Sequence, residues 1–259
     1  NVSESTVLQL ANNGKECKKW KQFNKTHLTR TFPSRHTEFR ASSKNSNPIL
    51  PWSMGCQFVA MNQQTCDAYV LVNDGRFRSN GSCGYVLKPP HLRQAHFADR
   101  HIDPELSKRK VTEWNICVLS GHNLPKPRSK YLSDTINPRV RITLYDGALS
   151  PPSLHITKSI EKNGLNPVWN EDVGATFRVL EPDVAILLIS LWDYNKETDG
   201  DEFIAACALP LKSIREGYRS VPLYDSNHMR CGSHAFSCLL MKVSLNDGRN
   251  HELSGMASF

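Results

Sequence analysis

Two residues in one short segment have side chains suited to holding a phosphorylated ligand. Arg30 and Phe32 lie in Leu28-Thr29-Arg30-Thr31-Phe32-Pro33, which reads as a short strand ending at a proline. A guanidinium can hold a phosphate through its fork of donors, and an aromatic face can cover the apolar side of a sugar ring. An isolated arginine is more often simply solvated, so a phosphate site here needs support from the rest of the chain.

Other reactive residue types form no recognisable site. The eight cysteines show neither metal-ligand spacing nor the density of a disulfide scaffold, which favours reduced thiols in a cytosolic protein. Gly81-x-x-Gly84 is not followed by Lys-Ser/Thr, so it indicates a structural turn and not a phosphate-cradling loop.

The length of 259 residues suits about two domains. No apolar run reaches the eighteen or so residues that span a bilayer, so we expect a globular chain. The chain starts at Asn1 and lacks the layout of a signal peptide, and we take it as a piece of a longer cytoplasmic protein.

Basic residues are concentrated in the first part of the chain. Residues 1–100 hold 14 Lys and Arg against 6 Asp and Glu, whereas the remaining 159 hold 18 against 19. Such an excess suits phosphorylated lipid headgroups or an anionic membrane surface. No zinc-finger spacing, basic heptad or RNA-binding signature accompanies it, so lipid is favoured over nucleic acid.

The first hundred residues contain helical and buried-strand patterns. Residues 3–23 suggest an amphipathic helix broken near 12–14, followed after a polar loop at 35–48 by a helix near 47–52. Lysines on the first helix form a basic face that is either solvated or in contact with a membrane, namely Lys15, Lys18, Lys19, Lys21 and Lys25. Two apolar runs, at 56–61 and 85–87, predict strands buried on both faces, with a turn element at 74–81 between them.

The same region resembles a known family. The string Gly55-Cys56-Gln57-x-Val59-Ala60-x-Asn62-x-Gln64-Thr65, then Gly75-x-Phe77-x-x-Asn80-Gly81-x-x-Gly84-Tyr85-Val86-Leu87-Lys88-Pro89, is similar to the Y box of eukaryotic phosphoinositide-specific phospholipase C. The resemblance implies that residues 1–93 form the second half of a TIM-like (β/α) barrel. It places Arg30 and Phe32 at the carboxyl end of a strand, where the sites of such barrels lie.

The resemblance also assigns roles. Arg30 matches a substrate-binding arginine, Phe32 stands where the family has tyrosine, and Ser3 matches a serine that binds the substrate phosphate. Phenylalanine keeps the stacking face and loses the hydroxyl. The two catalytic histidines and the ligands of the catalytic Ca²⁺ are expected in a preceding X half, because none of the ten histidines here matches an X-box motif.

The second half of the chain reads as all-β. After a polar linker at 94–112, residues 113–245 carry seven or eight short strands, which predicts an antiparallel sandwich, and 246–259 form a tail. The strands are expected at 114–119, 139–144, 176–180, 186–193, 203–209, 220–223 and 237–245. The motifs Leu119-Ser120-Gly121-x-x-Leu124-Pro125, Asn166-Pro167-x-Trp169-Asn170 and Asp201-x-Phe203-Ile204 resemble a C2 domain.

Calcium-binding C2 domains collect aspartates in loops at one end, because Ca²⁺ needs several oxygen ligands. Here Asn137 and Asn195 stand where the pattern has aspartates, which leaves Asp193, Asp199 and Asp201 as oxygen donors. The resemblance therefore implies weak or absent calcium binding by the sandwich.

Taken with the charge distribution, the resemblance implies a peripheral membrane enzyme that cleaves phosphatidylinositol phosphates to diacylglycerol and an inositol phosphate. The substrate and the anionic membrane would be its partners, together with the X half. Two other interpretations stay open, a catalytically inactive lipid-binding adaptor and a C2 scaffold that binds proteins. On this basis we expect 113–245 to fold alone and 1–93 to be poorly stable without its other half.

Overall fold

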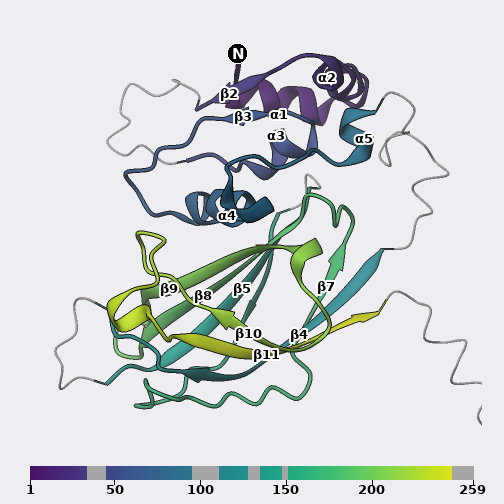
Figure 1. Ribbon diagram of the computed structural model, residues 1–259. Coiled ribbons are helices and arrows are strands. Elements are labelled where there is room, and N and C mark those ends of the chain that lie inside the picture. The colour runs from purple at the N-terminus through teal and green to yellow at the C-terminus, as the bar shows by residue number, and fades with distance from the viewer. Residues whose placement is uncertain (34–44, 95–110, 128–134, 148–150, 247–259) are drawn as a thin grey trace, which may run out of the picture.

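The computed structural model describes residues 1–33, 45–94, 111–127, 135–147 and 151–246. An α/β unit up to residue 94 lies against an all-β unit that begins at 112 (Figure 1). Most of the expected loop at 35–48, linker at 94–112 and tail at 246–259 lies outside the described residues. Within those ranges, no helix has both the length and the apolarity to cross a membrane.

The α/β unit is built on a small parallel sheet. Its strands are β1 (Val2–Ser3), β2 (Arg30–Phe32) and β3 (Phe58–Val59), in the order β1-β2-β3. The segment between β1 and β2 holds α1 (Glu4–Asn12) and α2 (Gly14–Thr26), and α3 (Ile49–Ser53) precedes β3. Asn13 ends α1 and caps α2, its Oδ1 accepting from the Glu16 N–H at 3.2 Å, which confirms the expected break. Parallel strands joined by helices are the repeating unit of a β/α barrel.

Two expectations for this unit are wrong. Residues 74–77, expected in a turn, end the helix α4 (Ala68–Phe77), because Asp67 Oδ1 accepts the N–H groups of Tyr69 and Val70, both at 3.0 Å, and starts it. The run at 85–87 forms no strand, and Tyr85 and Leu87 are 79% and 75% exposed. It has no ladder partner among the described residues, and an apolar run becomes a strand only where its backbone groups are paired. The 3-10 turn η1 (Asn80–Ser82) and α5 (Pro90–Arg93) complete the unit.

The second unit is the antiparallel sandwich that was expected, and its described residues form eight strands in two sheets of four. One sheet has the order β10-β11-β4-β7 and the other β6-β5-β8-β9. The strands are β4 (Thr112–His122), β5 (Pro138–Tyr145), β6 (Ser153–Ile156), β7 (Ala175–Val179), β8 (Ile186–Asn195), β9 (Gly200–Pro210), β10 (Gly217–Pro222) and β11 (Cys238–Asn246), with 3-10 turns η2 (Leu211–Ser213) and η3 (Gly232–His234). Of these strands, only β6 was not expected; it is a four-residue edge strand whose two aliphatic residues, Leu154 and Ile156, share one face and are both exposed.

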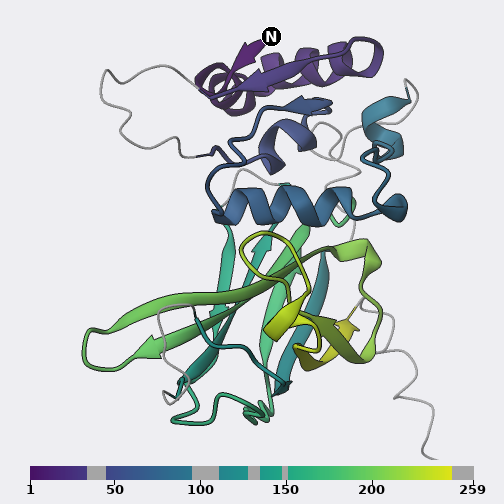
Figure 2. The same cartoon turned by 60° about the vertical axis from the view of Figure 1, so that its left-hand side comes forward.

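The two units share a core. Helix α4 lies across the outer face of β8 and β9, as both views show (Figures 1 and 2). We call this contact the α4 interface; its buried members are Ile49, Trp52, Leu71 and Val72 from the first unit and Tyr145, Ile186, Leu188, Ala206 and Ala208 from the sandwich. A Cβ on Gly75 would come within 2.5 Å of Ala208, so this glycine sets how closely helix and sheet approach.

Candidate headgroup site and sandwich loops

The three residues expected to bind substrate lie on one face of the parallel sheet. Ser3 is the register partner of Phe32, and both close their strands. Arg30 precedes Phe32 by two positions, so alternation along β2 puts both side chains on the same face, with buried Thr31 on the other. Arg30 opens β2 instead of closing it, but the three-residue strand places it only about 7 Å from Phe32.

Ser3 is also a helix cap. Its Oγ accepts the N–H of Thr6 at 3.3 Å and lies 3.0 Å from Ser5 Oγ and 2.8 Å from Thr6 Oγ1. The start of α1 therefore presents three hydroxyls beside Phe32, at the positive end of the helix dipole. Hydroxyls and backbone donors at such a position can bind an anionic oxygen.

A buried amide network fixes the start of β2. Asn24 is fully buried; its Nδ2 donates to Met54 O at 2.8 Å and its Oδ1 accepts from Thr29 Oγ1 at 2.8 Å. Gln57 Oε1 accepts the Thr29 N–H at 2.8 Å, and its Nε2 donates to the carbonyls of Asn24 and His27. These bonds lock the residue just before Arg30. In the sequence, Gln57 stands out only as part of the Y-box string, and Asn24 is one amide among lysines with no pattern that indicates this network.

Phe58 also belongs to this face, although the sequence pattern did not single it out. It is the register partner of Arg30, so the two side chains share a face, and Phe58 is 52% exposed. The expectation of burial on both faces is therefore wrong for β3 in this structure. The face of the sheet thus carries two aromatic rings flanking one guanidinium.

The basic face of α2 is narrower than expected. Lys15, Lys18 and Lys19 are exposed, and Lys19 pairs with Glu16 at 2.8 Å. Lys21 is only 7% exposed and so does not belong to a solvent-facing stripe. Lys25 donates to Gln94 O at 3.0 Å. One helical turn of lysines remains available to an anionic surface.

At one end of the sandwich, the three candidate calcium ligands all have protein partners. Asp193 is buried and accepts the Asn137 N–H at 2.8 Å, while Asp199 accepts from Tyr194 Oη at 2.9 Å. Asp201 accepts two hydrogen bonds from Arg139, from Nε at 2.6 Å and from Nη2 at 2.5 Å. It also forms an ion pair with Arg141. Among the described residues, no three His, Cys, Asp or Glu side chains are grouped to hold a metal ion.

Aromatic rings hold the two arginines beside Asp201. Arg139 lies 4.1 Å from the ring centre of Tyr194, and Arg141 lies 4.5 Å from that of Trp192. Burial, and to a lesser degree the nearby Arg139, lowers the pKa of Arg141. This end of the sandwich therefore places guanidinium groups around an acid that the C2 resemblance offered as a calcium ligand.

Comparison with known proteins agrees with both units. Residues 1–91 match the family model of the phosphatidylinositol-specific phospholipase C Y domain, and residues 113–225 match that of the C2 domain. The chain is 35% identical over 245 residues to human 1-phosphatidylinositol 4,5-bisphosphate phosphodiesterase delta-1, which covers 93% of this chain and 30% of the relative. It is 37% identical over 206 residues to the delta-4 protein of Bos taurus, covering 80% of this chain and 25% of the relative.

A solved structure shares the arrangement of the units. The crystal structure of L. pealei PLC21 superimposes with a TM-score of 0.74 at 27% identity, covering 95% of this chain and 29% of that one. The chain thus spans about 30% of the length of the human relative. The relatives and the solved structure match both units along one chain. The chain therefore belongs to the phosphoinositide-specific phospholipase C family, of which it carries the Y domain and the C2 domain.

Proposed function

We propose that the chain supplies the headgroup-binding side of an enzyme that hydrolyses phosphatidylinositol phosphates to diacylglycerol and inositol phosphates. The observation that carries this proposal is that Ser3, Arg30 and Phe32 lie on one face of the parallel sheet. The chain that holds them is similar to 1-phosphatidylinositol 4,5-bisphosphate phosphodiesterases. The guanidinium of Arg30 would pair with a ring phosphate, and Phe32 would stack on the inositol ring. The hydroxyls at the start of α1 would receive the substrate phosphate.

The proposal leaves bond cleavage to residues of a preceding X half. No metal-ligating group of three is found among the described residues, so a catalytic Ca²⁺ would be held by carboxylates elsewhere in the complete protein. When bound, such an ion would stabilise developing charge at the phosphate. The residues described here would orient the headgroup and bring the enzyme to a lipid surface.

For the sandwich, we propose membrane docking that does not depend on calcium held by Asp201. A cation at this carboxylate would have to displace two guanidinium groups, and the Asn137 and Asn195 amides offer less negative charge than aspartates. Exposed lysines at the start of α2 add attraction to an anionic leaflet, each worth about 1 kcal/mol near the surface.

The test is kinetic and uses the complete protein. Arg30→Ala should lower kcat/KM on phosphatidylinositol 4,5-bisphosphate by roughly ten- to a hundredfold, because one charge-assisted contact is lost, and should change the rate on phosphatidylinositol little. Phe32→Ala should lower both rates. Arg178→Ala, an exposed arginine on β7, is the matched control. Equal losses on both lipids for Arg30→Ala would show that Arg30 supports the barrel, whereas headgroup binding without hydrolysis would point to an inactive adaptor.

A further inference from the structure

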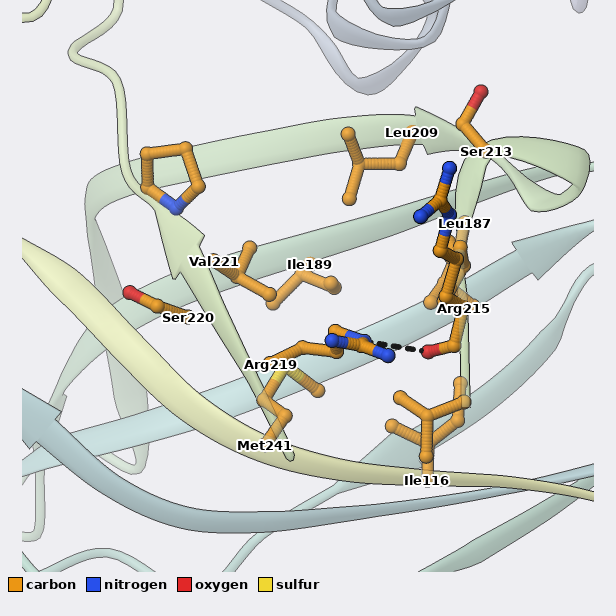
Figure 3. A pocket seen from close by; sticks show the side chains of 13 residues that line it. Ile116, Leu187, Ile189, Leu209, Ser213, Arg215, Arg219, Ser220, Val221 and Met241 are labelled. Carbon is orange, nitrogen blue, oxygen red and sulfur yellow. Dashed lines mark hydrogen bonds between the residues drawn. The ribbon is translucent and has the colours of Figure 1, made fainter. Parts of the chain in front are cut away.

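A pocket of about 270 Å³ opens between the two sheets of the sandwich (Figure 3). Its lining shares no residue with the parallel sheet face or with the Asp201 cluster. Its inner wall is aliphatic and comes from both sheets, with Ile116, Met241 and Val243 on one side and Leu187, Ile189 and Leu209 on the other. Five of these six side chains are buried.

Such a space is unusual in a sandwich core. Protein interiors are packed as densely as organic crystals, with few voids larger than a water molecule. Cavities lined by apolar side chains stay dry and take apolar guests; one of about 150 Å³ holds benzene. A pocket of this size therefore has room for a stretch of one hydrocarbon chain, and not for two chains side by side.

The mouth of the pocket is cationic. Arg215 and Arg219 lie at its rim, both exposed, and Arg219 extends across the lining toward the Arg215 backbone (Figure 3). Its Nε donates to the Arg215 carbonyl at 2.9 Å, and its Nη2 donates to the Glu216 carbonyl.

Nothing in the described chain neutralises these two charges. Neither guanidinium has a carboxylate partner among the described residues. The neighbouring acid, Glu216, is turned to the backbone, where its Oε1 accepts the Leu245 N–H at 2.7 Å. The rim therefore holds two positive charges above an apolar slot, which matches a molecule with an anionic head and an apolar tail.

We propose that this pocket binds a single-chain anionic amphiphile, with its hydrocarbon tail between the sheets and its carboxylate or phosphate head at Arg215 and Arg219. The site is separate from the headgroup site of the proposed function and does not depend on it. Partly buried Ile214, next to Arg215 in the chain, also lines the pocket and would contact the first methylenes of the tail.

Calorimetry on the whole chain with octanoate, decanoate and dodecanoate, each below its micelle concentration, tests the tail. Affinity should rise roughly fourfold per added methylene until the pocket is full. Dodecyl phosphate has a second kind of anionic head. Comparing its affinity with that of dodecanoate shows whether the rim prefers a phosphate or a carboxylate. Dodecyltrimethylammonium, which has the same tail and a cationic head, should bind at least about tenfold more weakly.

Variants test the site. The double change Arg215→Gln and Arg219→Gln should weaken dodecanoate roughly ten- to a hundredfold and leave 1-decanol unchanged. Ile214→Trp should weaken both ligands by filling the slot, and Arg178→Gln, on the opposite edge strand β7 of the same sheet, should weaken neither. An affinity that does not change with tail length, or that is equal for anionic and cationic heads, would overturn the proposal. Should Ile214→Trp fail to fold, the tail series on the unmodified chain still decides.

Discussion

The interior of the sandwich and the α4 interface are both apolar, yet they are assembled from different parts of the chain. The interior cluster is drawn entirely from residues 114–243, whereas the α4 interface joins residues 49–72 to residues 145–208. The sandwich therefore has a complete apolar interior and, on its outer face, a second apolar surface that packs against α4. The difference teaches that a domain boundary drawn from sequence motifs need not be a boundary in the folded core.

Strand β8 takes part in both clusters. Leu187, Ile189 and Leu191 point into the sandwich, while Ile186 and Leu188 face α4. Its apolar run at 186–189 is the pattern of a strand covered on both faces. The expectation that 113–245 folds alone therefore needs a qualification, because without α4 the sandwich would expose the outer face of this strand.

The strongest test compares the two faces of β8. In the whole chain, Ile189→Ala and Leu188→Ala should each cost about 2–5 kcal/mol of unfolding free energy, because both side chains are buried. In an isolated sandwich of residues 112–246, Ile189→Ala should keep that cost and Leu188→Ala should lose most of it. Urea unfolding of the four proteins and their parents measures this. A full cost for Leu188→Ala in the isolated sandwich would show that the α4 interface is not what buries it.

The next test separates helix from sheet. Gly75→Val places a side chain where a Cβ already comes within 2.5 Å of Ala208. Overpacking of this kind costs about 1–3 kcal/mol, so the melting temperature should fall and the sandwich interior should stay intact by near-ultraviolet circular dichroism. The matched control is Gly14→Ala, at the start of α2, where nothing lies within 4 Å of the added Cβ. Equal effects at both positions would contradict the proposed close approach.

A smaller effect is expected from the polar rim of the α4 interface. Asp74 of α4 and Arg78, which follows the last residue of α4, pair at 2.5 Å. His228, from the loop after β10, lies 3.4 Å from Asp74, and the Arg78 guanidinium lies 3.7 Å from the centre of the Tyr224 ring. Burial raises the pKa of Asp74, but hydrogen bonds from His228 and Arg78 outweigh it, so the net pKa is lowered.

A lowered carboxyl pKa stabilises the folded state at neutral pH, and this contribution is lost as pH falls through about 4 and below. Asp74→Asn should therefore cost about 1 kcal/mol or less at pH 7 and make stability fall less steeply at acid pH. Melting temperatures between pH 3 and 7 measure this, with exposed Asp172→Asn as control. If Asp74→Asn leaves the fall of the melting temperature at acid pH unchanged, the Asp74–Arg78 pair does not stabilise the α4 interface.

The smallest expected effect is that of calcium on the sandwich. With Asp201 held by two arginines, 1 mM Ca²⁺ should leave the melting temperature of the whole chain unchanged. A site with a Kd of about 10 μM would instead add about 2.7 kcal/mol, which is a shift of several degrees. Asn137→Asp and Asn195→Asp together with Arg139→Gln and Arg141→Gln should introduce a calcium-dependent shift. A shift in the unmodified chain would mean that the arginines yield to the ion.

Several features followed from sequence alone because they depend on local pattern. The broken helix at 12–14 was set by an Asn-Asn-Gly break, and strand β8 by a run of β-branched and aliphatic residues. The resemblance to the Y box and the C2 domain named the family correctly. Ser3, Arg30 and Phe32 were singled out one by one, since each matched a motif position.

What the sequence left undecided is how distant segments meet. Residues 74–77 read as a turn because an Asp-Gly pair is common in turns, but packing of α4 on Ala206 and Ala208 favours a glycine inside that helix. The run at 85–87 reads as a strand, yet a strand exists only where another strand pairs with it. Asp201 reads as an oxygen donor, and only the pairing of β5 with β8 and of β8 with β9 brings Arg139 and Arg141 to its carboxylate. Local propensity selects helix or strand, but the partner of each surface and each charge is selected by contacts between residues far apart in the chain.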